Sequence, residues 1–375
     1  MISPKIFFDI LQNNGIDFYT GVPDSLLKDF CGYVTDNTSN KDHIINSNEG
    51  AAVALASGHY IATGNPAMVY MQNSGLGNAV NPLMSLADPE VYSIPMLLMI
   101  GWRGEPGRED EPQHRKQGRV MLKMLEAMEI PYQIVNKASE DIKEITARAC
   151  SFIRENNAPF ALIISEGTFE EYSIKQNASQ VYPLKREEAL KIILEKLNRN
   201  DIVVSTTGKT SREIFEYREN CNQGHENDFL TIGSMGHCSQ IAYGIAMNHT
   251  DTQVYIIDGD GAVLMHMGSL AILGTSTAEN LKHIIINNGA HDSVGGQPTA
   301  GFSINIPDIA KACGYRFARS AETAEQIKNG FQNLSQSKGP SLLEIRVNKG
   351  SRKDLGRPSI TPVENKKNLM TFLSK

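Results

Sequence analysis

Short apolar runs recur along the chain, separated by segments whose apolar residues fall at helical spacing. The runs do not alternate apolar and polar residues, and many are rich in β-branched side chains. Such runs are typical of strands that are buried on both faces of a parallel sheet. The predicted strands are residues 18–22, 44–46, 67–71, 95–100, 132–135, 160–164, 202–206, 229–232, 254–257, 283–286, 316–318 and 341–347.

The intervening segments are predicted to be crossover helices, for example over residues 50–63 and 187–198. A further helix is expected over residues 4–14, where Ser3 can act as the N-cap and Pro4 occupies the first helical position.

The alternation lapses in the polar stretch SIKQNASQVYPLKR, residues 173–186, and then resumes. Residues 176–186 are therefore predicted to link a domain of residues 1–175 to one of residues 187–375. A chain of 375 residues suits two domains, since single cores usually stop growing beyond about 250–300 residues. The expected fold class is α/β, with two doubly wound parallel-sheet domains.

Composition narrows the class of protein. The net charge of −6 and pI near 5.9 argue against a nucleic-acid or membrane-surface partner. The five cysteines have no metal-binding spacing and are expected to be reduced thiols. The N-terminus does not resemble a signal peptide, and no apolar run approaches the roughly 20 residues that span a bilayer. We expect a cytoplasmic protein.

The most informative stretch is residues 254–298. One predicted strand runs into DGDG (258–261), and the next ends in NNG (287–289). Parallel strands end at one edge, so Asp260 and Asn288 can converge there and offer the oxygen ligands that suit Mg²⁺. The glycines and the following helix suit a phosphate. GDG alone is also typical of a simple strand-to-helix turn, but the pair favours a magnesium-diphosphate site.

This pair, with 25 residues between GDG and NN, resembles the signature of the thiamine diphosphate-dependent enzymes. The resemblance implies that Asp260 and Asn288 are Mg²⁺ ligands and that the backbone carbonyl of Ala290 is the third. It also implies that the first domain binds the pyrimidine of the cofactor and the second its diphosphate. The cofactor-binding residues implied at this edge are Gly259, Asp260, Gly261, Ala262 and Asn288.

The segment Gly233-Ser234-Met235-Gly236 resembles another part of that family's site. The resemblance implies that Met235 lies beneath the thiazolium and that the Gly233 carbonyl accepts a hydrogen bond from the aminopyrimidine. A methionine considered alone is more typical of a core position, but the flanking glycines favour the cofactor site.

In the first half, EGAA (49–52) and SGHYIATG (57–64) resemble the pyrimidine-domain motif. The resemblance implies that Glu49 contacts the aminopyrimidine ring nitrogen and promotes formation of the reactive ylid. The alternative is an acid that interacts with a helix macrodipole. Because Glu49 and Asp260 lie in different halves, and the family builds each site from two subunits, a homodimer or larger homo-oligomer is implied.

The chain lacks the third domain of many 2-oxo-acid decarboxylases and resembles the two-domain phosphonopyruvate and sulfopyruvate decarboxylases. The second group often has its domains on separate subunits, so the fused chain favours the first. The motifs that carry this resemblance are TGVPDS (20–25), QNSGLGN (72–78), GWRG (101–104), DEPQH (110–114), TTGKTSR (206–212) and NNGAHDSVGGQ (287–297).

Either substrate has two anionic ends, and candidate contacts with it are Ser25, Arg103 and His291. Asp24 and His114 are candidate proton-transfer groups. Asp24 is equally consistent with a helix cap, and His114 with an ordinary loop histidine.

Two further segments are rich in charge or glycine. Residues 102–119 are predicted to be a mobile loop, either a lid over the substrate or a solvated charged loop. Gly208, Lys209 and Thr210 resemble part of a P-loop, but Val203 stands where its first glycine belongs, so nucleotide hydrolysis is rejected. We expect these three residues near the cofactor diphosphate or the substrate phosphonate.

The expected activity is decarboxylation of phosphonopyruvate to phosphonoacetaldehyde and CO₂, with thiamine diphosphate and Mg²⁺, in phosphonate biosynthesis. The alternatives are a sulfopyruvate decarboxylase, a carboligating transferase of the acetolactate-synthase kind, and a non-catalytic protein that only binds the cofactor.

Overall fold

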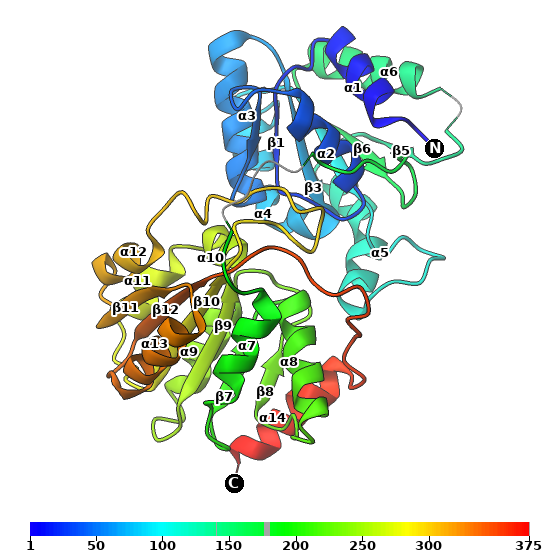
Figure 1. Cartoon of the computed structure of the whole chain (residues 1–375). Helices are drawn as coiled ribbons and strands as arrows, with labels where there is room; N and C mark the ends of the chain where they lie inside the picture. Colours follow the sequence, from blue (N-terminus) through cyan, green and yellow to red (C-terminus); the bar gives the residue numbers. More distant parts are fainter. Residues whose placement is uncertain (140, 176–180, 375) are drawn as a thin grey trace. The chain divides into compact units, whose positions relative to one another are not determined.

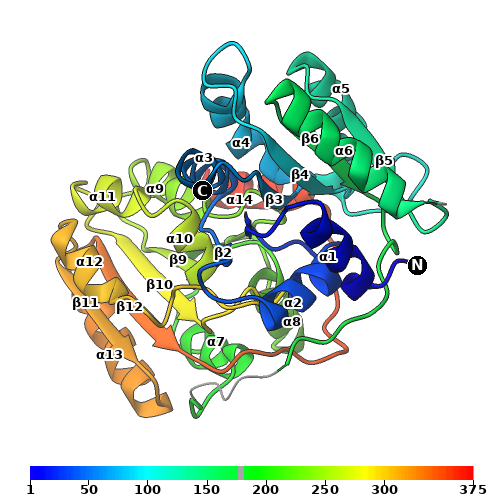
Figure 2. The same cartoon turned by 90° about the horizontal axis from the view of Figure 1, so that it is seen from above.

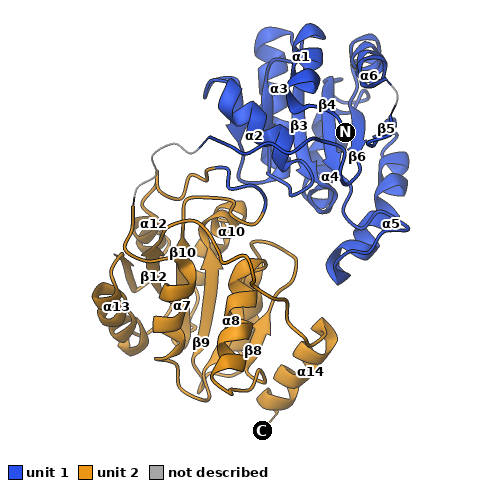
Figure 3. Ribbon diagram, turned by 45° about the vertical axis from the view of Figure 1, so that its right-hand side comes forward, with its two compact units in different colours: residues 1–177, 294–297 blue, residues 178–293, 298–375 orange. Residues whose placement is uncertain are grey.

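The computed structural model describes residues 1–139, 141–175 and 181–374. The chain divides into two compact units. Unit 1 comprises residues 1–177 and 294–297, and unit 2 comprises residues 178–293 and 298–375 (Figure 3). The predicted linker, residues 176–186, lies partly outside the described residues. No helix in the described part of the chain is both long and apolar enough to span a membrane.

Unit 1 contains a parallel sheet of six strands in the order β2-β1-β3-β4-β6-β5, covered by helices on both faces (Figure 1). Its strands are β1 (Tyr19–Gly21), β2 (His43–Ile45), β3 (Ala67–Gln72), β4 (Met96–Gly101), β5 (Tyr132–Val135) and β6 (Phe160–Ile164). Its helices are α1 (Pro4–Asn13), α2 (Lys28–Asn37), α3 (Glu49–Thr63), η1 (Asn73–Gly75), α4 (Leu76–Pro82), η2 (Leu83–Ala87), α5 (Pro112–Ala127) and α6 (Ile142–Asn156).

Unit 2 repeats this topology, with its six parallel strands in the order β11-β12-β10-β9-β7-β8. Its strands are β7 (Ile202–Ser205), β8 (Asp228–Leu230), β9 (Val254–Gly259), β10 (Leu281–Asn287), β11 (Phe317–Ala321) and β12 (Ser341–Arg346). Its helices are α7 (Arg186–Leu194), α8 (Lys209–Asn220), α9 (Cys238–Ala246), α10 (Asp260–Met265), α11 (Ser269–Gly274), α12 (Ile306–Ala312), α13 (Ala324–Gln336) and α14 (Pro362–Leu373).

Both faces of each sheet are apolar because successive strand residues point to opposite sides. In β3, Val69 and Met71 join the cluster beneath α3, α4 and α5, whereas Met68 and Tyr70 join the cluster beneath α1, α2 and α6. Unit 2 is built in the same way, and in Figure 2 helices α12 and α13 lie on opposite faces of β11 and β12. All twelve predicted strands are confirmed, as is the α/β fold class.

Three local predictions were wrong. Ser3 makes no side-chain capping hydrogen bond, although Pro4 does begin α1. The helix expected to continue to residue 198 ends at Leu194. The mobile loop expected over residues 102–119 is helical in its second part: Pro112–Ala127 form α5, and the Trp102 indole is buried and donates a hydrogen bond of 2.9 Å to the Gly118 carbonyl.

Candidate active site

The candidate residues of unit 1 lie at the carboxyl edge of its sheet. Asp24 follows β1, Gln72 ends β3 and Arg103 follows β4. The strand order reverses between β1 and β3, and open α/β sheets bind ligands at such a switch point.

Asp24 is fully buried and held from two sides. One carboxylate oxygen accepts a hydrogen bond of 2.6 Å from Gln72 Nε2, and the other accepts one of 3.0 Å from the Leu26 amide. Burial raises the pKa of this carboxyl above its ordinary value. Because α2 begins at Lys28 with Leu27 in the N-cap position, the reading of Asp24 as a helix cap is wrong.

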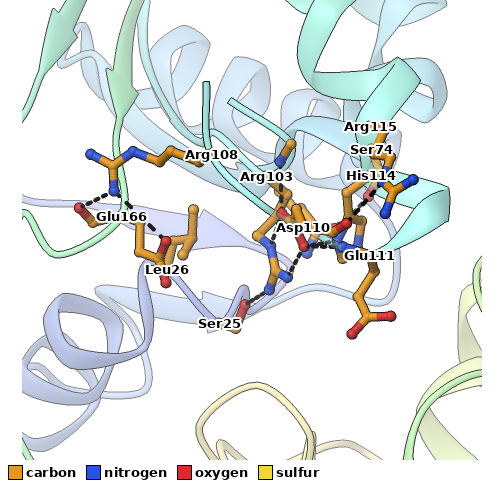
Figure 4. Close-up of polar contacts among 12 residues, drawn as sticks. Ser25, Leu26, Ser74, Arg103, Arg108, Asp110, Glu111, His114, Arg115 and Glu166 are labelled. Carbon is orange, nitrogen blue, oxygen red and sulfur yellow. Dashed lines mark hydrogen bonds and ion pairs between the residues drawn. The ribbon is translucent and has the colours of Figure 1, made fainter. Parts of the chain in front are cut away.

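Asp110 lies at the centre of a polar cluster with Arg103 and His114 (Figure 4). It accepts hydrogen bonds from Arg103 Nε at 2.8 Å and from the Gly104 amide at 2.7 Å, and His114 Nδ1 lies 2.9 Å away. Arg103 Nη1 also donates to Ser25 Oγ at 2.8 Å. Burial alone would raise the pKa of Asp110, but the hydrogen bonds from Arg103, His114 and backbone amides outweigh it and hold that pKa well below its ordinary value.

This cluster joins three of the predicted residues, Ser25, Arg103 and His114, at one edge of unit 1. His114 lies on α5 and not in a loop. Asp110 had no assigned role, although the DEPQH motif contains it. A carboxylate two residues before a helix that starts with Pro112 was the available signal.

Glu49 is the first residue of α3 and is only 5% exposed. Its Oε2 accepts a hydrogen bond of 2.8 Å from Asn78 Nδ2. Burial raises the pKa of the Glu49 carboxyl, and the Asn78 hydrogen bond opposes the effect. A buried carboxyl of this kind retains a proton closer to neutral pH than a surface acid does.

The turn of residues 72–78 connects these groups. Gln72 holds Asp24, and Asn78 holds Glu49. Between them, Asn73 Nδ2 donates to the Arg103 carbonyl at 2.7 Å. Sequence reasoning matched QNSGLGN as a motif but assigned no role to its polar side chains, whose partners lie up to 48 positions away.

The candidate residues of unit 2 lie at the equivalent edge, where β7, β9 and β10 end. Asp260 begins α10 and is 2% exposed. The Asn288 amide lies 3.4 Å from its Oδ1, and Thr299 Oγ1 donates to its Oδ2. The Asn288 side-chain oxygen accepts a hydrogen bond of 3.1 Å from the Ala290 amide, so the three predicted metal ligands lie in adjoining turns.

Asp260 has the character of a metal ligand. Burial raises its pKa to about 6. Among the described residues, no cationic side chain forms an ion pair with this carboxylate. A divalent cation would supply the missing positive charge, and a carboxylate, an amide oxygen and a backbone carbonyl are ligands that Mg²⁺ accepts. The residues present therefore fit this metal.

The Met235 side chain lies beside Gly261, in the turn that also contains Asp260. A Cβ built on Gly261 would lie 3.3 Å from Met235 Cε and 3.2 Å from His291 Cε1. Met235 is half-buried and belongs to neither apolar core of unit 2. It follows Gly233 and Ser234 in the connection after β8, where Ser234 has a φ of 53°. Burial lowers the pKa of His291 to about 4.

The GKT segment lies beside the turn that follows Asn288. Gly208 has a φ of 96° and precedes α8, and a Cβ on it would lie 3.2 Å from Ser293 Oγ. Lys209 Nζ donates a hydrogen bond of 3.0 Å to the Asp292 carbonyl, and Thr210 is buried in the first helical turn.

Both parts of the chain match one family. Residues 4–128 match the description "Thiamine pyrophosphate enzyme, N-terminal TPP binding domain", and residues 206–345 match the corresponding C-terminal TPP binding domain. A phosphonopyruvate decarboxylase of Streptomyces viridochromogenes is 31% identical over 97% of this chain and 93% of its own length. The chain belongs to the thiamine pyrophosphate-dependent decarboxylases.

Two other relatives within this family cover nearly the whole chain. A phosphonopyruvate decarboxylase of Streptomyces hygroscopicus is 30% identical over 100% of this chain and 95% of its own length. A sulfopyruvate decarboxylase of Methanosarcina acetivorans is 25% identical over 92% of this chain and 90% of its own length. The sulfopyruvate decarboxylase is a single chain that spans both domains. The fusion of the two domains therefore does not distinguish a phosphonopyruvate decarboxylase from a sulfopyruvate decarboxylase.

Gly75 packs directly against the Glu49 carboxylate, so a substitution at Gly75 tests whether this turn positions Glu49. A Cβ on Gly75 would lie 2.2 Å from Glu49 Oε1, whereas one on Gly77 meets no atom of the described chain within 4 Å. Gly75→Ala is expected to displace the carboxylate and lower kcat by about 100-fold, in keeping with misplaced catalytic groups. Gly77→Ala should leave kcat unchanged. Equal kcat values for the two variants would contradict the positioning of Glu49 by this turn.

Proposed function

We propose that the chain is a phosphonopyruvate decarboxylase, which converts 3-phosphonopyruvate to phosphonoacetaldehyde and CO₂ in phosphonate biosynthesis. The observation that carries this proposal is the 31% identity, over 97% of the chain, to a relative of that name. The identity to the single-chain sulfopyruvate decarboxylase is lower, at 25%.

The residues of unit 2 would hold the cofactor. We propose that Asp260, Asn288 and the Ala290 carbonyl bind Mg²⁺, and that the amides of Gly261 and Ala262 bind the diphosphate. Gly208, Lys209, Thr210, Gly233, Ser234, Met235 and Gly259 are the further proposed cofactor contacts. When bound, thiamine diphosphate supplies the nucleophilic carbon and the electron sink for loss of CO₂.

Acidic side chains of unit 1 would donate and accept the protons that the reaction transfers. Glu49 would bind the ring nitrogen of the cofactor, and its raised pKa allows it to hold or release a proton there. Asp24 also has a pKa raised by burial, so it can carry the proton that replaces CO₂ in the product. His114, held by Asp110, is the second candidate for this role.

Arg103, Ser25 and His291 are the proposed substrate contacts. Arginine has five N–H groups. Among the described residues, three of these N–H groups on Arg103 donate to Asp110 and Ser25, so donors remain for an acidic group of the substrate. Both carboxylate oxygens of Asp110 accept hydrogen bonds from the Arg103 guanidinium, so the guanidinium is oriented before the substrate binds.

We propose a cytoplasmic homodimer or larger homo-oligomer in which one site takes Glu49 from one subunit and Asp260 from another. Co-expression of Glu49→Gln and Asp260→Asn chains tests this arrangement. Shared sites with random pairing would restore about a quarter of wild-type activity from two inactive chains, in line with the isologous contacts of a dimer. No recovery would contradict sites built from two subunits.

A substrate panel tests the proposed activity. Release of CO₂ should be fastest from phosphonopyruvate, slower from sulfopyruvate and negligible from pyruvate. Faster release from sulfopyruvate would instead support the second candidate, which the Methanosarcina relative favours. A product longer than the two-carbon aldehyde would identify a carboligating transferase.

A further inference from the structure

Arg186 and Glu213 form a buried ion pair in unit 2 to which sequence reasoning assigned no role. Arg186 Nε and Nη2 donate to the two Glu213 carboxylate oxygens at 2.7 and 2.8 Å. Their side chains are 6% and 1% exposed. Two parallel hydrogen bonds of this kind fix the plane of the guanidinium.

The stability of α7 does not explain this arginine. Arg186 is the first residue of that helix, where a cation opposes the macrodipole. The helix start is already capped, because the Glu188 carboxylate accepts a hydrogen bond of 2.7 Å from the Lys185 amide. The third contact of Arg186 suggests another purpose.

That third contact leads to the cofactor edge. Arg186 Nη1 donates to Asp292 Oδ2 at 3.1 Å, and Asp292 follows the proposed metal ligand Ala290 by two residues. The Asp292 carbonyl accepts from Lys209 Nζ at 3.0 Å, while Asp292 Oδ2 lies farther from that ammonium, at 3.7 Å. Glu213, Arg186, Asp292 and Lys209 thus form one chain of contacts.

The charges of these four side chains cancel. Arg186 and Lys209 are cations and Glu213 and Asp292 are anions, so the cluster has no net charge beside the proposed diphosphate site. Without Arg186, the Asp292 carboxylate would draw the Lys209 ammonium toward itself and place an uncompensated negative charge near a negative ligand. With Arg186 in place, Lys209 keeps N–H groups for the diphosphate.

We infer that Arg186 and Glu213 are positioning residues that set the turn of residues 288–292 and the direction of Lys209 for cofactor binding. This inference rests on the proposed function. Residues that orient metal ligands from behind typically change metal affinity by about 10–100-fold when replaced.

A second buried ion pair, between Arg218 on α8 and Asp228 at the start of β8, offers a matched control. Arg218 Nε and Nη2 donate to the Asp228 carboxylate at 3.0 and 2.8 Å, with side chains that are 8% and 0% exposed. The third contact of Arg218 leads to Gln223, in the exposed connection after α8. The two pairs are alike in geometry and burial, and only the Arg186 pair contacts Asp292.

The experiment compares R186M/E213L with R218M/D228L. Replacing both members with apolar residues avoids an unpaired buried charge, so both proteins should fold. Titration calorimetry of thiamine diphosphate in excess Mg²⁺ should give a Kd about 10–100-fold weaker for R186M/E213L and an unchanged Kd for R218M/D228L. Thermal unfolding of the cofactor-free proteins should show that the two double variants differ from the wild type in Tm by similar amounts.

Arg186→Lys keeps the positive charge and serves if the double variant does not fold. Lysine cannot make two parallel hydrogen bonds to Glu213 and also contact Asp292, so the Kd should weaken in the same direction. A Kd for R186M/E213L or Arg186→Lys equal to that of the wild type would overturn the inference and leave a purely structural ion pair. A wild-type protein that binds no thiamine diphosphate would overturn the proposed function as well.

Discussion

Glu49→Gln is expected to bind thiamine diphosphate with nearly wild-type affinity and to lose turnover by about 10²–10⁴-fold. Glutamine preserves the size of the side chain and its hydrogen bond with Asn78 but cannot hold the proton that activates the cofactor. The structure supports this role because Glu49 is buried and its pKa is raised. Paired measurements of kcat and of the cofactor Kd separate catalysis from binding.

Glu126→Gln is the matched control for this substitution. Glu126 is an exposed acid of unit 1 that accepts a hydrogen bond of 3.0 Å from Tyr132. Its replacement should change neither kcat nor the cofactor Kd. Turnover of Glu49→Gln equal to that of the wild type would remove Glu49 from the mechanism.

Asp260→Asn is expected to abolish Mg²⁺-dependent cofactor binding and yet to stabilise the metal-free protein above pH 6. The Asp260 pKa is about 6 in the folded protein, against an ordinary value of 3.8. The folded state therefore binds this proton more tightly than the unfolded state does. Between these values the contribution to stability falls as pH rises, by roughly 3 kcal/mol in all.

Urea unfolding in the presence of a chelator tests this sign. The variant should exceed the wild type in unfolding free energy at pH 8, and the two should converge near pH 4. Added Mg²⁺ and cofactor should stabilise the wild type only. A variant that is less stable than the wild type at pH 8 would contradict the account of a buried carboxylate without a cation.

The central strands of each sheet could be predicted from the sequence because they are buried on both faces, whereas the edge strands β2, β5 and β11 are only partly buried. β10 is buried along its whole length, and its apolar run Ile284–Ile286 could be identified without knowledge of its neighbours. Helix α5 was missed because its buried residues, such as Met121 and Leu125, lie in its second half. Its first turns carry polar residues, among which His114 contacts the Asp110 carboxylate and Arg115 donates to the Asp110 carbonyl. A polar segment without an apolar stripe resembles a loop.

The convergence of Asp260 with Asn288 was also predictable, since parallel strands end at one edge. The supporting contacts were not. Asn78 reaches Glu49 across 29 positions, and Arg186 reaches Glu213 across 27. Such pairings depend on how helices pack against the sheet, which periodicity does not encode.

Phosphorus NMR of the protein with phosphonopyruvate tests the central claim most directly. With thiamine diphosphate and Mg²⁺ present, the phosphonopyruvate signal should be replaced by that of phosphonoacetaldehyde, with one CO₂ released per molecule. Omitting the cofactor or chelating the metal should leave the substrate unchanged. A persistent phosphonopyruvate signal in the complete mixture, with wild-type protein that binds the cofactor, would contradict the proposed activity.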